Sequence, residues 1–187
     1  MLYCDICELY AKNESLFLDP ISEKKRYLLH SEISDPKYID QMRLFVRTAV
    51  LPYVSKGNAL DYGAGRTKTL GTLLENAGFQ ISTYDVYFNP DKIVLNREYD
   101  LVTATEVVEH FQDLEYEWTV LLKLVKKGGI LAISTLFTPS ELKDWWYLRD
   151  ITHYHFYGER TFEGLAMKHR LEILYTDHKS IIVFKKF

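Results

Sequence analysis

The amino-acid sequence predicts an α/β fold built on a doubly wound sheet, and three observations carry this prediction. An apolar strand at residues 58–62 ends in an acid, reaches two glycines and runs directly into a helix. A second strand, residues 80–85, also ends in a carboxylate. Two more buried strands follow, at residues 99–105 and 130–136. Strands that alternate with helices form sheets covered by helices on both faces.

Composition limits the class of protein. The chain has 187 residues, of which 47% are hydrophobic and 26% charged, and its net charge is -3. We expect one globular unit at residues 57–187. An N-terminal segment at residues 1–56, with the Cys-x-x-Cys pair and helices, is expected to precede it and to pack on it. The charge gives no field that attracts nucleic acid or anionic membrane. No apolar run reaches the roughly 18 residues of a membrane span, and the start lacks a signal-peptide pattern, so we expect a cytoplasmic protein.

Two cysteines near the N-terminus have the spacing of a zinc knuckle. Cys4 and Cys7 form a Cys-x-x-Cys pair, but a closed zinc site needs four ligands and no second pair follows. His30 is a candidate third ligand that nothing in the sequence requires. Two ordinary thiols in a reducing compartment explain the pair as well, and we assign no metal ligand.

Two helices are expected before the first long strand. Residues 22–30 have a helical pattern, and a longer helix begins at Pro36 with Asp35 as its cap. Three side chains of this region fit either contact with a ligand or ordinary packing: Tyr27, His30 and Tyr38.

The glycine-containing turn at residues 61–65 is the centre of the prediction. Gly63 and Gly65 allow the backbone to turn and approach a ligand closely, beside the N-terminus of a helix. Lys68 stands where a dinucleotide fingerprint needs its third glycine, which disfavours a nicotinamide cofactor. Asp61, two residues before the first glycine, suits a ligand that is cationic near this turn, such as S-adenosylmethionine. The alternative is a turn that only connects strand and helix.

The second strand supports the binding interpretation. Asp85 follows Gly65 by 20 residues, a separation at which an acid returns beside the glycine turn and can bind ribose hydroxyls. A lone aspartate after a strand can also be a simple turn residue. The aromatic loop at residues 86–90 fits either adenine stacking or burial, and residues 92–95 are expected to form a short strand.

The next loops bring titratable groups to the same edge of the sheet. Glu106, Glu109 and His110 follow the strand at residues 99–105 and should lie near the glycine turn. His110 is either a general base or an orienting, structural residue.

The last third of the chain contains an unusually aromatic segment, residues 145–157. It fits either a lid over a substrate, with Asp150 orienting His153, or an aromatic plug on the sheet. A helix at residues 159–168 and a hairpin around residues 177–178 complete the expected elements.

Together these motifs resemble the class I S-adenosylmethionine-dependent methyltransferases over roughly residues 57–187. The motifs are Asp61-x-Gly63-x-Gly65, the strand ending in Asp85, Glu106-Val107-Val108-Glu109-His110, Lys127-Gly128-Gly129, and the run Trp146, Asp150, Thr152, His153, Phe156 and Tyr157. The run is similar to small methyltransferases that begin with a zinc ribbon. Thr67 departs from the family, which usually has a third glycine there.

The resemblance implies a Rossmann-like, seven-stranded sheet whose last strand is antiparallel, with an N-terminal helical extension. It implies S-adenosylmethionine as cofactor, with contacts divided as follows: Asp61, Gly63 and Gly65 at the methionine end, Asp85 at the ribose, Val86 to Phe88 around the adenine, and Glu106 near the methionyl group. We expect Asp61 and Asp85 to face one crevice.

The expected reaction is methyl transfer to a small-molecule acceptor. If the acceptor must lose a proton, His110 and His153 are the candidate catalytic bases. Two alternatives stay open from the sequence: a noncatalytic module that binds the cofactor or a partner, and a nicotinamide-dependent oxidoreductase on a similar sheet.

Overall fold

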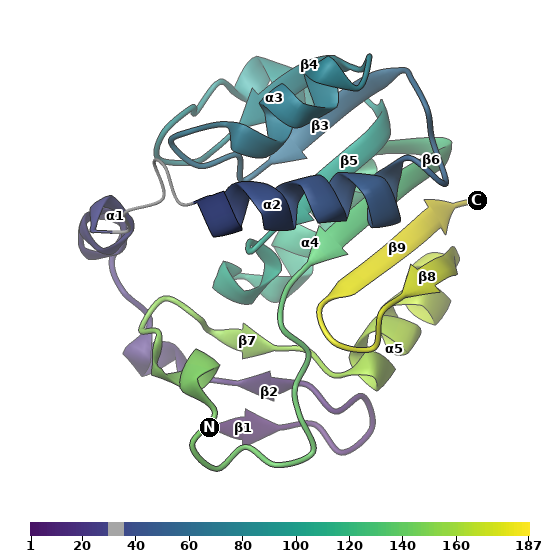
Figure 1. Ribbon diagram of the computed structural model, residues 1–187. Helices are drawn as coiled ribbons and strands as arrows, with labels where there is room; N and C mark the ends of the chain where they lie inside the picture. The colour runs from purple at the N-terminus through teal and green to yellow at the C-terminus, as the bar shows by residue number, and fades with distance from the viewer. Residues whose placement is uncertain (30–35) are drawn as a thin grey trace.

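A computed structural model describes residues 1–29 and 36–187, and the main sheet of these residues has six strands in the order β4-β3-β5-β6-β9-β8 (Figure 1). The strands are β3 (Asn58–Tyr62), β4 (Gln80–Tyr84), β5 (Tyr99–Thr105), β6 (Val125–Ser134), β8 (Leu171–Thr176) and β9 (Ile181–Lys186). The first four pair in parallel, and β9 runs antiparallel between β6 and β8. This confirms the predicted α/β fold with its antiparallel last strand.

The predicted seventh strand is a correction. Residues 92–96 form a 3-10 helix, η4 (Lys92–Asn96), instead of an edge strand. The Asp91 side chain accepts a hydrogen bond from the Ile93 amide and so caps this turn. The Tyr99 hydroxyl donates to the Val94 carbonyl at 2.8 Å. The cap and this contact hold residues 92–96 in a helical turn, so the short apolar pattern alone was misleading.

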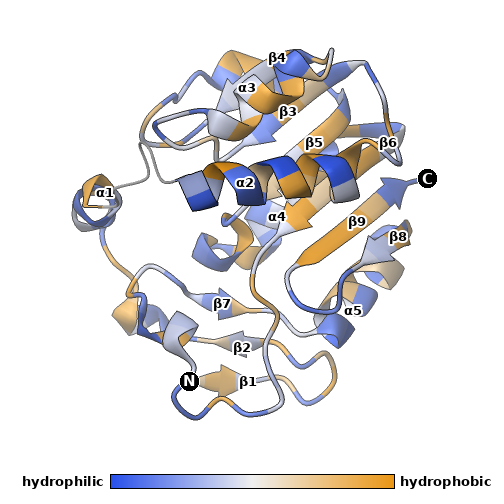
Figure 2. Ribbon diagram, in the orientation of Figure 1, coloured by the Kyte–Doolittle hydropathy of each residue, from blue (hydrophilic) through white to orange (hydrophobic). Residues whose placement is uncertain are grey.

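Helices cover both faces of the sheet. On one face lie α2 (Pro36–Phe45), the π-helical turn η3 (Val46–Val50) and α3 (Thr69–Asn76), and on the other α4 (Leu114–Lys123) and α5 (Glu159–His169). Figure 2 shows apolar residues concentrated along β5, β6 and β9 and on alternate turns of α2. Burial of these surfaces, worth roughly 25 cal/mol per Å² of apolar area, holds the layers together.

A second, small sheet was not predicted. It consists of β1 (Leu2–Tyr3), β2 (Tyr10–Ala11) and β7 (His155–Phe156), and β2 pairs antiparallel with β7. Cys4 and Cys7 lie in the turn between β1 and β2 as free thiols. The short helices η1 (Glu14–Leu16) and α1 (Pro20–Leu28) follow. The N-terminal segment therefore shares a sheet with the aromatic run (Figure 1).

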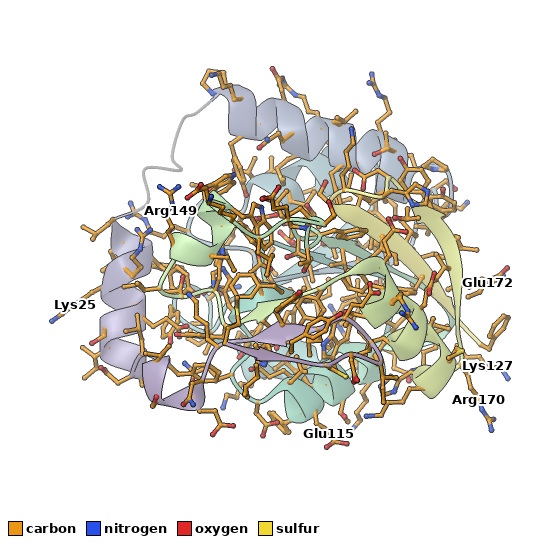
Figure 3. The ribbon with its side chains drawn as sticks, turned by 90° about the horizontal axis from the view of Figure 1, so that it is seen from below. Lys25, Glu115, Lys127, Arg149, Arg170 and Glu172 are labelled. Carbon is orange, nitrogen blue, oxygen red and sulfur yellow. The ribbon has the colours of Figure 1, made fainter. Side chains whose placement is uncertain are left out.

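Charged side chains lie on the surface of the molecule. Figure 3 shows Lys25 of α1, Glu115 of α4 and Arg170 pointing away from the body of the molecule. Within residues 1–29 and 36–187, no helix has the length and apolar character needed to cross a membrane.

Candidate functional site

A cavity of about 820 Å³ lies at the carboxyl ends of β3, β4 and β5. Its walls come from α1, from the glycine turn, from the loop after β4, from η5 (Val108–His110) and from η6 (Trp146–Arg149). Its lining combines aromatic and apolar side chains with polar ones, several of which are carboxylates. This is the place in an open α/β sheet where ligands bind.

The glycine turn uses its amides within the fold. The amides of Gly63 and Ala64 both donate to the Tyr84 carbonyl, at 2.8 and 2.9 Å. Gly63 has a φ of 75°, and a β-carbon there would collide with Cγ2 of Val107. Gly63 is therefore required both by its left-handed backbone and by its close packing. At Gly63 and Gly65 the turn therefore exposes backbone atoms, and no side chains, to the cavity.

Asp85 is fixed at the cavity wall by backbone amides. Its Oδ1 accepts hydrogen bonds from the amides of Tyr87 (2.8 Å) and Phe88 (2.9 Å), and its Oδ2 accepts one from Gly65 (3.0 Å). The side chain lines the cavity, as predicted. Oδ2 keeps acceptor capacity for a ligand, because a carboxylate oxygen accepts two hydrogen bonds. Val86, also predicted, lines the cavity next to it.

Asp61 does not reach the cavity, contrary to the expectation that it faces Asp85 across a crevice. It is 1% exposed and is not among the lining residues. Its Oδ1 accepts a hydrogen bond from the Thr103 hydroxyl at 3.0 Å, and its Oδ2 lies beside Gly71 of α3 without a hydrogen bond of normal geometry. Burial raises the pKa of Asp61 to about 6. Asp61 therefore contributes to the structure around the glycine turn and does not line the cavity.

Glu106 points into the cavity from the end of β5. Its backbone has a φ of 52°, a left-handed conformation that costs a non-glycine residue about 1–2 kcal/mol. The carboxylate accepts a hydrogen bond from the Ser134 hydroxyl (3.4 Å), and its Oε2 lies 3.2 Å from the Tyr147 hydroxyl, whose single proton is donated to Glu109. The residue is exposed on the cavity side, and the partial desolvation of its carboxyl together with the neighbouring Glu109 raises the pKa of Glu106.

Glu109 lies behind this wall and is fully buried. Its Oε1 accepts a hydrogen bond from the Tyr147 hydroxyl, while Oε2 has no hydrogen-bond partner among the described residues. Burial raises the pKa of Glu109 as well. The sequence placed Glu109 near the ligand, but no pattern indicated the part played by Tyr147.

The two predicted histidines meet in the cavity wall. The His110 and His153 rings lie 4.8 Å apart, centre to centre. Nδ1 of His110 is 2.7 Å from the Thr152 carbonyl, and Nδ1 of His153 is 3.0 Å from the Tyr147 carbonyl. A carbonyl only accepts, so each Nδ1 carries the proton and each Nε2 offers a lone pair.

Both imidazoles are neutral near pH 7. Burial lowers the pKa of His110, and burial together with the neighbouring His110 lowers the pKa of His153 to about 3. The predicted orienting role of Asp150 is wrong: its carboxylate accepts hydrogen bonds from Thr152 and pairs with Arg26 at 2.8 Å. The His153 ring is held by the Tyr147 carbonyl instead.

Helix α1 closes the cavity through a residue that the sequence did not reveal. Glu23 is 6% exposed and accepts hydrogen bonds from the hydroxyls of Tyr27 (3.5 Å), Tyr87 and Tyr154 (3.0 Å). Tyr27 lies one turn further along α1, but Tyr87 and Tyr154 come from distant segments, so no local pattern marks Glu23 as buried. Its position on an amphipathic helix was the only signal.

The remaining candidates divide between the cavity and the core. Tyr27 and Tyr38 line the cavity, while His30 and Asp35 lie outside the described residues. The aromatic run is divided between the cavity and the core. Its first half lines the cavity through Trp146, Tyr147, Asp150 and His153, whereas Tyr154, His155, Phe156 and Tyr157 are buried.

Known proteins place this architecture in a family. Residues 35–176 match the model of the methyltransferase domain family. No curated protein sequence matches the chain. Among solved structures, it is similar to 1,6-didemethyltoxoflavin-N1-methyltransferase of Burkholderia thailandensis, with bound 1,6-didemethyltoxoflavin and S-adenosylhomocysteine. That match has a TM-score of 0.65 and 13% identity, and covers 95% of this chain and 94% of the other.

Two further structures show the same fold. An O-methyltransferase family protein of Burkholderia thailandensis matches with a TM-score of 0.60 and 12% identity, over 88% of this chain and 62% of that one. Magnesium protoporphyrin IX methyltransferase of Synechocystis PCC 6803, with bound S-adenosylhomocysteine, matches with a TM-score of 0.53 and 14% identity, over 93% and 98%.

The family match spans most of the sheet and every wall of the cavity except α1, and it favours a methyltransferase over the alternative of a nicotinamide-dependent oxidoreductase. The chain belongs to the methyltransferase domain family and is a class I S-adenosylmethionine-dependent methyltransferase.

Proposed function

We propose that this methyltransferase acts on a small-molecule acceptor that binds in the cavity beneath α1. The observation that carries the proposal is that one cavity of about 820 Å³ connects Asp85 and the glycine turn with His110 and His153. This volume lies within the roughly 300–1,000 Å³ of cavities that hold small ligands. Cofactor and acceptor would therefore share one enclosed space.

The cofactor end fits an adenosyl group. Asp85 Oδ2, with its spare acceptor capacity, would bind the ribose hydroxyls, and Val86 would border the adenine. The bare backbone at Gly63 and Gly65 would allow close approach. Glu106 lines the cavity and carries the carboxylate that suits a cationic methionyl group, a part for which Asp61 is placed too deep.

The bound cofactor supplies a methyl group that its sulfonium makes electrophilic. The task of this chain is to align an acceptor with that methyl group and to exclude water. His110 and His153 line the acceptor end, and each offers Nε2 to an acceptor hydroxyl, amine or thiol. They are the proposed catalytic residues.

The walls favour a planar or apolar acceptor. Aromatic side chains from several segments surround the cavity, among them Tyr27, Phe88, Trp146 and Tyr147. Aromatic walls bind flat ligands by stacking and by burial. The bound 1,6-didemethyltoxoflavin of the Burkholderia thailandensis structure is a small molecule in a protein of the same fold. The two free thiols are consistent with the expected cytoplasmic location.

A labelled-methyl assay tests the proposal. The protein is incubated with methyl-labelled S-adenosylmethionine, a panel of small phenols, amines, thiols and heterocycles, and, in parallel, protein and RNA extracts. We expect label in at least one small molecule and none in the macromolecules. Label found only in protein or RNA, or no transfer by protein that binds S-adenosylhomocysteine, would contradict the proposed acceptor class.

A further inference from the structure

Three titratable side chains converge at the acceptor end of the cavity, two of them in its wall and one directly behind it. Glu109, His110 and His153 each offer one ligand atom, and these atoms all lie within 4.8 Å of one another. They come from two segments, η5 and the run that follows η6, so the convergence is produced by the tertiary fold.

The two imidazoles are oriented as metal ligands are. Each donates its Nδ1 proton to a backbone carbonyl, that of Thr152 for His110 and that of Tyr147 for His153. Such outer bonds fix the tautomer and the ring orientation, and leave a neutral Nε2 available for a metal. Both features are present without any ion.

The third group, Glu109, supplies a second observation that points to a ligand. Glu109 is fully buried, and its Oε2 has no hydrogen-bond partner among the described residues. A buried polar atom without a partner is costly and calls for an explanation such as an ion. The Tyr147 hydroxyl holds the other oxygen, Oε1. Tyr147 therefore orients both Glu109 and His153.

We infer that Glu109, His110 and His153 form a binding site for one divalent transition-metal ion, with Zn²⁺ as the ion that two imidazoles and a carboxylate suit. Bond lengths of about 2.0–2.2 Å place neighbouring ligand atoms about 3–4 Å apart, so binding draws the three atoms slightly inward. Two of the ligands line the cavity, so the ion keeps an open position toward the acceptor. Three protein ligands with an open position are typical of catalytic zinc.

The chemical role of such an ion rests on the proposed function. An acceptor hydroxyl, amine or thiol bound to the ion would lose its proton more readily, and the proton would pass to water. The acceptor atom then forms the new bond to the methyl carbon, while the bond from that carbon to sulfur breaks and its electron pair stays on sulfur. The histidines would act as ligands in this scheme and not as bases. Metal binding itself does not depend on the acceptor.

The experiment measures metal and not methyl transfer. The background is the full chain carrying Cys4→Ser and Cys7→Ser, which removes the thiols of the N-terminal knuckle as competing ligands. After treatment with a chelator, this protein is titrated with Zn²⁺ by calorimetry and with Co²⁺ by visible absorption. We expect one ion per chain and Co²⁺ bands typical of nitrogen and oxygen ligands.

Matched variants locate the site. His153→Gln and Glu109→Gln should weaken Zn²⁺ binding at least tenfold. His155→Gln is the control, because His155 is equally buried and also bonds through Nδ1 to a carbonyl, that of Phe111, but lies outside the cluster. It should leave Zn²⁺ affinity unchanged, and circular dichroism of all variants checks folding.

Two results would overturn the inference: no stoichiometric Zn²⁺ or Co²⁺ binding by the folded background protein, or equal affinity in folded His153→Gln. Either would leave the cluster as a network of buried polar side chains. Titration with S-adenosylhomocysteine on the same samples separates this failure from that of the proposed function. Protein that binds Zn²⁺ but methylates no small molecule keeps the metal site and loses only the acceptor.

Discussion

The two ends of the cavity are built in different ways. At the cofactor end, Asp85 and the glycine turn bind each other through backbone amides, and three hydrogen bonds hold the carboxylate. At the acceptor end, Glu109 has an oxygen without a partner and two imidazoles have an Nε2 to offer. The groups at the first end are fixed by hydrogen bonds, which suits a cofactor that is the same in every reaction. The groups at the second end have atoms available to interact with an acceptor.

The acceptor end should show the largest effect. His153→Ala and His110→Ala are expected to lower turnover of an identified acceptor by roughly 10²–10⁴-fold, the usual contribution of a positioned acid, base or ligand group. Affinity for S-adenosylhomocysteine should change less than threefold in a calorimetric titration, because Asp85 is unaffected. His155→Ala is the buried control. Wild-type turnover in both cavity variants would remove the histidines from the mechanism.

A substitution of Asp61 tests whether this residue contributes to the stability of the fold and not to cofactor binding. Its pKa is raised from 3.8 to about 6, so between about pH 4 and pH 6 the folded protein keeps a proton that the unfolded chain has released. The stability that this group contributes is therefore complete below about pH 4 and is lost as the pH rises through 6. The loss amounts to up to about 3 kcal/mol.

Asp61→Asn removes this titration and keeps an acceptor for Thr103. The difference in unfolding free energy between variant and wild type should grow in favour of the variant from pH 4 to pH 7, as measured by urea unfolding. Comparison of the two proteins cancels other raised carboxyls, such as Glu117. Affinity for S-adenosylhomocysteine should be retained. A variant that folds but no longer binds it would return Asp61 to the ligand contacts.

Asp85 tests the same end directly. Asp85→Ala removes the acceptor for ribose hydroxyls and also the partner of the Gly65 amide, so affinity for S-adenosylhomocysteine should fall about 10–100-fold. Asp91→Ala is the matched control: Asp91 also accepts a backbone amide after β4 but does not line the cavity. Equal affinities of the two variants would contradict the ribose contact.

A substitution in helix α1, which covers the cavity, should have the smallest effect. Glu23→Ala removes the acceptor shared by three tyrosine hydroxyls and loosens α1, so the KM for the acceptor should rise, by tenfold or less. Lys25→Ala, on the outward side of the same helix, should change nothing (Figure 3). An unchanged KM in Glu23→Ala would show that α1 does not enclose the acceptor.

The position of the glycine turn and of Asp85 at one edge of the cavity could be predicted because the signals for them are local. The strand, the two glycines and Asp85 lie within 28 residues, and each has a backbone reason for its position. Asp61 was assigned to the ligand because a pattern does not show on which side of a turn a carboxylate points. Contact with Thr103 of the neighbouring strand decided this in the fold.

The acceptor end was predicted only in outline. His110 and His153 were expected at the site and do line the cavity, but Tyr147 and Glu23 were not expected there, since their hydrogen bonds join residues 38 and 131 positions apart in the sequence. The pairing of β2 with β7 likewise joins residues 10–11 to 155–156 through two-residue strands that have no readable pattern. Residues 92–95 were predicted to form a strand but lie in η4, because a pattern of only four residues does not distinguish a short strand from a helical turn.

A crystal structure with S-adenosylhomocysteine tests the central claim that one cavity joins the two ends. We expect the ribose hydroxyls within about 2.6–3.2 Å of Asp85 Oδ2 and the sulfur atom facing the space in front of His110 and His153. A sulfur atom directed away from the two histidines, or a ligand bound outside this cavity, would contradict the account.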